Sequence, residues 1–163
     1  MLPTFTKFWL ASGKDIGPTP LNAMDFAYLN AGVGDKNLMI VSSVLPIGCK
    51  LVEPEPLDPD GGLLYIAAAR KKREGNEFLG RVFMTAAVAV GVPADPNESG
   101  LIMEHSGYFN APKDGENKVK QMVMDGMVKR KRAIKTILSI SATQEITAIT
   151  GPSAVFACCV LIP

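Results

Sequence analysis

Histidine and cysteine are scarce in this sequence, which has His105 as its single histidine and three cysteines, Cys49, Cys158 and Cys159. Catalysis by a Ser-His-Asp or Cys-His arrangement would depend on His105 alone, so neither is a strong hypothesis. A metal site is not expected, because Cys158 and Cys159 are adjacent and lie inside an apolar run rather than at ligand spacing. We expect the cysteines to be buried free thiols.

The sequence also lacks a strong net charge and long apolar runs. Its 17 Lys and Arg residues nearly balance 16 Asp and Glu residues, giving a net charge of +1, so no global field favours nucleic acid or a membrane. No segment reaches the roughly 20 apolar residues of a membrane span, and no signal peptide is recognisable at the start. No Gly-rich nucleotide loop follows a predicted strand. These absences predict a cytoplasmic protein without nucleic-acid or membrane partners.

The remaining composition is that of one globular domain over residues 1–163, with 47% hydrophobic and 20% charged residues. Thr19-Pro20 is typical of a helix start, and Gly32 or Gly34 of its end. On this helix Leu21, Met24, Tyr28 and Ala31 are expected to face the core. A second helix is expected within 112–132, weakened by Gly126. Strands are predicted at 5–11, 37–41, 101–105, 136–142 and 155–162, with strands or buried helices at 63–69 and 82–92 and an irregular connection over 47–62.

This order of elements predicts a mixed α/β or α+β sandwich. Two basic clusters, residues 70–73 (RKKR) and 129–132 (KRKR), interrupt the pattern. Solvated ends of a hairpin or helix explain them more simply than phosphate contacts. A nucleic-acid-binding module using both clusters would bind in a salt-dependent way, but the near-neutral charge and the lack of interleaved aromatic residues count against it.

Two adjacent serines, Ser42 and Ser43, follow the apolar run 38–41 and precede Pro46. Proline stops a strand pattern, so the pair is expected where a buried strand ends or bends. Two hydroxyl groups at such a position either satisfy nearby backbone groups or take part in chemistry. The serines alone leave both interpretations open.

The run from Thr19 to Pro46 resembles the N-terminal signature of the pyruvoyl-dependent arginine decarboxylases. A second segment, Gly100-Leu101-Ile102-Met103-Glu104, resembles a later active-site segment of that family. The matching pieces of the first run are Thr19-Pro20-Leu21-Asn22-Ala23, Asp25, Leu29-Asn30-Ala31-Gly32, Gly34, Asn37-Leu38, Ser42-Ser43 and Pro46. Helices layered over two packed, mixed sheets are the fold that the resemblance implies, with homo-oligomers that are trimers or dimers of trimers and a pocket between neighbouring chains.

The resemblance implies a chain that makes its own cofactor. Ser43 Oγ would attack the carbonyl of Ser42, and the resulting ester would eliminate to leave a beta chain, 1–42, and an alpha chain, 43–163, with a pyruvoyl group at its start. Amino acid decarboxylation needs such an electron sink, since no ordinary side chain stabilises a carbanion at the α carbon. The implied reaction converts L-arginine to agmatine and CO2, through a Schiff base with the pyruvoyl group, in polyamine biosynthesis.

Three further residues match the family's functional positions. Asn37 matches a processing residue that stabilises an oxyanion, although a turn cap at the start of a strand explains it equally well. Glu104 matches the proton donor, a role that requires burial or a neighbour to raise its pKa. Asp25 matches a substrate contact, and a carboxylate is a natural partner for a guanidinium, whereas the residues alone equally allow a solvated surface acid.

Two features depart from the family pattern. Tyr28, one helical turn after Asp25, stands where a smaller aliphatic residue is expected in the substrate pocket, and the segment 63–81 carries the first basic cluster. Another basic amino acid is therefore an alternative substrate. A further alternative is a homologue that is never cleaved and serves as a structural or regulatory subunit, which a denaturing gel distinguishes from a cleaved enzyme.

Overall fold

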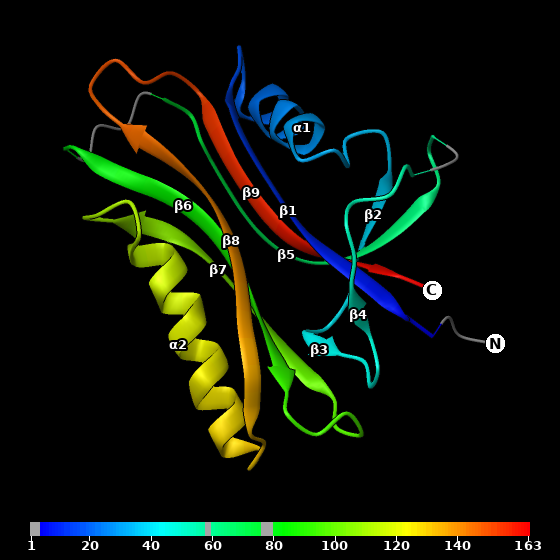
Figure 1. Ribbon diagram of the computed structural model, residues 1–163. Helices are drawn as coiled ribbons and strands as arrows, with labels where there is room; N and C mark the ends of the chain where they lie inside the picture. The colour runs from blue at the N-terminus through cyan, green and yellow to red at the C-terminus, as the bar shows by residue number, and fades with distance from the viewer. Residues whose placement is uncertain (1–3, 58–59, 76–79) are drawn as a thin grey trace.

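The computed structural model describes residues 4–57, 60–75 and 80–163, in which the chain forms nine strands and two helices (Figure 1). A five-stranded sheet, here the larger sheet, has the order β2-β5-β9-β1-β4, and a four-stranded smaller sheet has the order β3-β7-β6-β8. The elements are β1 (Lys7–Ile16), α1 (Pro20–Asn30), β2 (Asn37–Ile40), β3 (Val44–Leu45), β4 (Lys50–Leu51), β5 (Leu63–Arg73), β6 (Val82–Pro93), β7 (Gly100–Phe109), α2 (Asp114–Lys129), β8 (Ile134–Ile146) and β9 (Ser153–Ile162).

The two sheets pack face to face, with α1 on the outer face of the larger sheet and α2 on the outer face of the smaller one (Figure 1). This arrangement confirms the expected α+β layered sandwich. The larger sheet is mixed, because β2 pairs with β5 and β4 with β1 in parallel while β9 is antiparallel to both of its neighbours. Every described pair of the smaller sheet is antiparallel, so the expectation of two mixed sheets is wrong for that sheet. A short β6–β7 connection allows only an antiparallel pair.

β9 shows why the chain forms layers. Its side chains alternate between the space separating the two sheets and the space beneath α1. Cys159 faces the other sheet and Cys158 faces α1. Both thiols are buried and free, as expected, and burial raises the pKa of Cys158 to about 12. Cys49 is free but only half-buried.

The first helix begins and ends as predicted. The Thr19 hydroxyl accepts a hydrogen bond from the Asn22 N–H at 3.2 Å, and Gly32 has a φ of 75° just beyond the helix. Leu21, however, is 70% exposed, so its expected place in the core is wrong. A Cβ on Gly13 of β1 would collide with the Ala27 carbonyl. This close approach turns the small side chains of α1 toward the sheet and leaves Leu21 at the rim.

Between α2 and β8, the Glu116 carboxylate accepts hydrogen bonds from Ser139 Oγ at 2.5 Å and Ser141 Oγ at 3.3 Å and pairs with Lys120 Nζ at 3.1 Å. The Ser139 hydrogen bond is the largest of the causes that lower the pKa of Glu116. A carboxyl whose folded pKa lies below its unfolded pKa contributes stability above the unfolded value and loses it as pH falls through the folded value.

We therefore expect Glu116→Gln to lower the free energy of unfolding by about 1–2 kcal/mol at neutral pH, toward the lower end of the ~1.5–3 kcal/mol of a hydrogen bond to a charged group, because the carboxylate is partly exposed. The difference should shrink in acid, where the wild-type carboxyl is protonated. Urea denaturation of both proteins at neutral and acidic pH measures it, with Lys120→Ala as a control that should cost no more than about 0.5 kcal/mol. An equal loss at both pH values would contradict the role of the charge.

The first basic cluster ends a strand rather than a hairpin or a helix, so the expected type of element is wrong, while Arg70 and Lys72 are exposed to solvent as expected. β5 continues through it to Arg73. Lys71 Nζ lies 4.7 Å from the centroid of the Tyr108 ring. Arg73 is buried and donates a hydrogen bond from Nη1 to the Thr150 carbonyl at 2.8 Å. The strand begins with apolar residues and ends with basic ones, and the basic side chains are accommodated because they contact an aromatic ring and a backbone carbonyl.

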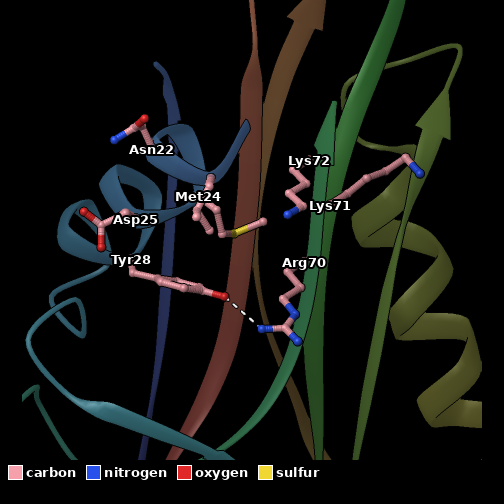
Figure 2. A pocket seen from close by; sticks show the side chains of 8 residues that line it. Asn22, Met24, Asp25, Tyr28, Arg70, Lys71 and Lys72 are labelled. Atoms are coloured by element: carbon pink, nitrogen blue, oxygen red, sulfur yellow. Dashed lines mark hydrogen bonds between the residues drawn. The ribbon is translucent and has the colours of Figure 1, made fainter. Parts of the chain in front are cut away.

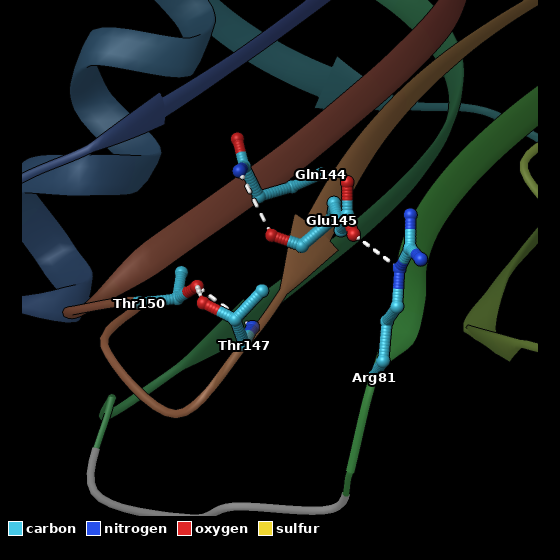
Figure 3. Close-up of polar contacts among 5 residues, drawn as sticks. All are labelled: Arg81, Gln144, Glu145, Thr147 and Thr150. Carbon is cyan, nitrogen blue, oxygen red and sulfur yellow. Dashed lines mark hydrogen bonds and ion pairs between the residues drawn. The ribbon is translucent and has the colours of Figure 1, made fainter.

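Further polar contacts lie close to Thr150, where β6 begins and β8 ends (Figure 3). Arg81 Nε donates to Glu145 Oε1 at 2.5 Å, and the Thr147 N–H donates to the Thr150 hydroxyl at 2.9 Å. In the second basic cluster, Lys129 ends α2 as predicted. Arg132 donates to the carbonyl and hydroxyl oxygens of Ser99, both at 2.9 Å. Arg132 therefore connects the end of α2, through hydrogen bonds, to the loop before β7.

Two other expectations concern single elements. The connection 47–62 carries, among its described residues, one short strand, β4, which pairs with β1. Gly126, which was expected to weaken the second helix, lies against β7, where a Cβ would collide with the Leu101 side chain. A larger residue at this position would push α2 away from the smaller sheet. Neither helix in the described part of the chain is long and apolar enough to cross a membrane.

Candidate active site

The serine pair lies where the chain crosses from the larger sheet to the smaller one, between β2 and β3 (Figure 1). Before the pair, the Val41 N–H donates to the Ile66 carbonyl of β5 at 2.9 Å, and after it the Ile102 N–H of β7 donates to the Ser43 carbonyl at 2.9 Å. Both sides of the Ser42–Ser43 peptide bond are therefore fixed to different sheets. The predicted strand end is confirmed, but β2 is mostly exposed rather than buried.

A three-residue turn encloses Ser43. The Val44 N–H donates a hydrogen bond to the Ser42 carbonyl at 2.9 Å, the pattern of a γ-turn. The turn fixes the direction of the carbonyl that precedes Ser43.

Glu104 meets this turn from β7, where it pairs with Val88 of β6. Ser43 Oγ donates a hydrogen bond to Glu104 Oε1 at 2.5 Å. Burial raises the pKa of Glu104, and the Ser43 hydrogen bond opposes this rise only in part. Glu104 Oε2 is buried and has no hydrogen-bond partner within the described ranges. The carboxyl can therefore hold a proton near neutral pH more readily than an exposed glutamate, and one of its oxygens is free to exchange that proton.

Asn37 opens β2, away from the serines. Its side-chain amide donates to the Gly61 carbonyl at 2.5 Å, and its backbone N–H donates to the Gly62 carbonyl at 2.9 Å. This is the placement of a cap at the start of a strand. Within one chain, the contacts of the Asn37 side chain therefore lie at the start of β2 and not at the serines.

Asp25 and Tyr28 lie in a different place, a cleft of about 820 Å³ between α1 and β5 (Figure 2). Arg70 and Lys72 point toward α1, as residues two apart on a strand should, and Lys71 points away from it (Figure 2). Arg70 Nη1 donates to the Tyr28 hydroxyl at 3.0 Å. The lining residues are Leu21, Asn22, Met24, Asp25, Tyr28, Arg70, Lys71 and Lys72.

The structure thus brings Ser43 together with Glu104, and Asp25 together with Tyr28, in two separate places of one chain. The sequence analysis did not identify Arg70 and Lys72 as cleft residues. Their i, i+2 spacing places both side chains on one face of a strand, but the strand was predicted to end at residue 69. No cluster of three or more His, Cys, Asp or Glu side chains suited to a metal occurs in residues 4–57, 60–75 and 80–163.

A serine pair that joins two sheets and contacts a half-buried carboxyl fits a decarboxylase of the pyruvoyl-dependent class. A family model described as pyruvoyl-dependent arginine decarboxylase matches residues 7–162. This chain belongs to the pyruvoyl-dependent arginine decarboxylase family, whose cofactor is a covalently bound pyruvoyl group. Ser43 and the free oxygen of Glu104 fit that group, since residue 43 can supply it and the carboxyl can exchange a proton beside it.

Curated relatives agree with this assignment. The chain is 33% identical over 137 residues to the pyruvoyl-dependent arginine decarboxylase of Methanococcus vannielii, covering 84% of this chain and 80% of the relative. It is 36% identical over 132 residues to that of Methanocaldococcus jannaschii, covering 81% and 76%, and 36% identical over 148 residues to that of Pyrococcus abyssi, covering 90% and 89%. Among solved structures, pyruvoyl-dependent histidine decarboxylase at pH 8 matches with a TM-score of 0.47 and 15% identity, covering 68% of this chain and 53% of that one.

Proposed function

We propose that this protein converts L-arginine to agmatine and CO2, in polyamine biosynthesis, with a pyruvoyl group made from its own Ser43. The observation that carries the proposal is the 2.5 Å contact between Ser43 Oγ and Glu104 Oε1 at the sheet junction, in a chain that matches the family over residues 7–162. When the pyruvoyl group is present, its carbonyl supplies the electron sink that decarboxylation at an α carbon requires.

The group forms when Ser43 Oγ attacks the Ser42 carbonyl carbon and the peptide bond becomes an ester. Loss of the Ser43 α proton then breaks the ester and releases 1–42 with a carboxylate end. Water hydrolyses the remaining dehydroalanine to the pyruvoyl end of 43–163 and ammonia. The short contact with Glu104 supports this proposal, since a buried carboxylate with a raised pKa is a stronger base toward the hydroxyl proton. Asn37 assists by holding the start of β2 against Gly61.

After cleavage Glu104 acts as an acid. Its raised pKa keeps a proton on the carboxyl at a pH where an exposed glutamate is ionised. The unpartnered Oε2 is the oxygen from which the proton reaches the substrate α carbon once CO2 has left. One carboxyl therefore serves both stages, as a base before cleavage and as an acid during turnover.

Asp25 is proposed to bind the guanidinium of arginine, because a carboxylate accepts two parallel N–H bonds from that group. Tyr28, bonded to Arg70, borders the same cleft. Ser43 is not among the residues that line this cleft, so we infer that Asp25 of one copy serves Ser43 of the next in a trimer or dimer of trimers.

Exposed apolar side chains around the serine pair support such an assembly, since a group of them on one edge marks an interaction surface. Met39 and Ile40 precede the serines on an edge strand, and Val44 follows them. Ile47, a few residues further along the chain, is exposed as well. Three unpaired cysteines further support action in the cytoplasm.

The test is to incubate the purified protein with L-arginine, L-lysine and L-ornithine separately and to measure CO2 and the amine products by mass spectrometry. Agmatine from arginine, with little amine from the other two, is the expected result. A cleaved protein that converts another amino acid better would contradict the substrate, and a chain that is never cleaved would favour a structural or regulatory subunit.

We expect Asp25→Asn to raise KM for arginine about 10–100-fold, the equivalent of one charged hydrogen-bonded contact, while cleavage into two chains proceeds normally. Steady-state kinetics and a denaturing gel measure the two effects. Asp125→Asn on α2 removes the same charge outside the cleft and should leave KM unchanged. Equal changes in both variants would mean that only the net charge matters.

A further inference from the structure

The backbone groups around the Ser42–Ser43 peptide bond have separate partners. The Ser43 carbonyl accepts from the Ile102 N–H, one position before the first pair of the β3–β7 ladder, Val44–Leu101. In an antiparallel pair hydrogen-bonded and non-hydrogen-bonded positions alternate. Val44, opposite Leu101, therefore occupies a non-hydrogen-bonded position, and its N–H points away from β7. That N–H lies 2.9 Å from the Ser42 carbonyl oxygen instead.

We propose that the Val44 N–H is the oxyanion donor for self-cleavage. The inference rests on the proposed function, since it concerns the step that makes the cofactor. The Ser42 carbonyl oxygen is the atom that acquires negative charge when Ser43 Oγ attacks the carbonyl carbon. A donor 2.9 Å from this oxygen in the uncleaved chain is in place to stabilise the charge as it develops.

The step balances within the chain. Ser43 Oγ gives its proton to the Glu104 carboxylate and bonds to the Ser42 carbonyl carbon, while the carbonyl π pair moves onto the oxygen held by Val44. The carbonyl then re-forms, the bond from that carbon to the Ser43 nitrogen breaks, and the nitrogen takes the proton from Glu104. The products of the step are an ester between Ser42 and Ser43 Oγ and a free amine on Ser43.

Asn37 of the same chain is not placed for this task. Its amide is bonded to Gly61 at the far end of β2 from the serines. The Val44 N–H belongs to the same turn as the attacking hydroxyl, so the hydrogen bond and the nucleophile are positioned by one local structure. Asn37 therefore acts as a positioning residue, through β2.

The test replaces the backbone N–H of Val44 with an ester oxygen, by incorporating the α-hydroxy acid analogue of valine during cell-free synthesis of the full chain. Removing one oxyanion donor should slow cleavage roughly 10²–10³-fold. Val52 provides a matched control, because its N–H also makes one 2.9 Å backbone bond, to Phe8, away from the serines. The same replacement at Val52 should change the cleavage rate less than tenfold.

Cleavage is followed by intact mass under denaturing conditions, and the urea midpoint of each uncleaved chain reports whether it is folded. Slow cleavage confined to a folded Val44 ester supports the proposal. Cleavage of that ester at the wild-type rate overturns it, and so does equal slowing at Val52. If the wild-type chain itself is never cleaved, the proposed function fails instead. A Val44 ester that does not fold is replaced by Val44→Pro, which also lacks the N–H and is judged by the same rates.

Discussion

Replacing Ser43 with alanine is expected to leave one uncleaved chain of 17.4 kDa that releases no CO2 from arginine. Alanine has no hydroxyl to attack the Ser42 carbonyl, so neither the ester nor the pyruvoyl group can form. The bonds that hold the two sides of the peptide, to Ile66 and Ile102, are made by backbone atoms and persist in the variant. The loss should therefore reflect chemistry rather than unfolding. Intact mass under denaturing conditions, beside the wild-type protein, measures the outcome.

Ser42→Ala distinguishes the two serines. The proposed contribution of Ser42 is its backbone carbonyl, so this variant should still divide into two chains between residues 42 and 43. Division of Ser43→Ala at the same bond would rule out Ser43 as the nucleophile. A Ser42→Ala chain that stays whole would give the exposed Ser42 hydroxyl a part in cleavage that the structure does not assign to it.

These two variants depend on a contact that the sequence alone does not reveal. Ser43 and Glu104 are 61 positions apart and meet because β3 and β7 pair in one particular register. The apolar run and Pro46 correctly predicted that the serines follow a strand. They did not show that the next two residues pair in the other sheet, because a two-residue strand is too short to have a pattern. Only the family resemblance placed Ser43 and Glu104 in one site.

The first basic cluster shows a second limit of sequence reasoning. Four consecutive cations have neither the alternation nor the β-branched content of a strand, so they resemble a solvated end. β5 nevertheless continues through them, because Tyr28, Tyr108 and the Thr150 carbonyl provide partners. All three partners come from distant parts of the chain. The helix start at Thr19 was predictable because its signal is local, in the hydroxyl and the N–H that it caps.

Glu104→Gln is expected to lower kcat per cleaved chain roughly 10²–10⁴-fold, the usual contribution of a positioned general acid. An amide has no proton to return to the α carbon of the substrate. Cleavage should also slow, because an amide cannot take the proton that Ser43 Oγ gives up, so kcat is calculated per cleaved chain. The amount of cleaved chain is measured by intact mass, and turnover by release of CO2 from arginine.

The pH profile separates this role from a structural one. The proton donor must be protonated, so wild-type kcat should fall as pH rises through the pKa of Glu104, which burial holds above its ordinary value. The residual turnover of Glu104→Gln should lack this fall. Glu116→Gln is the matched control, since it neutralises another partly buried glutamate on the opposite face of the smaller sheet, whose pKa is lowered. It should retain the wild-type profile. If kcat of Glu104→Gln falls with pH as it does in the wild type, another group donates the proton. If kcat of Glu104→Gln does not change with pH, the carboxyl beside Ser43 is the proton donor in the chemical step.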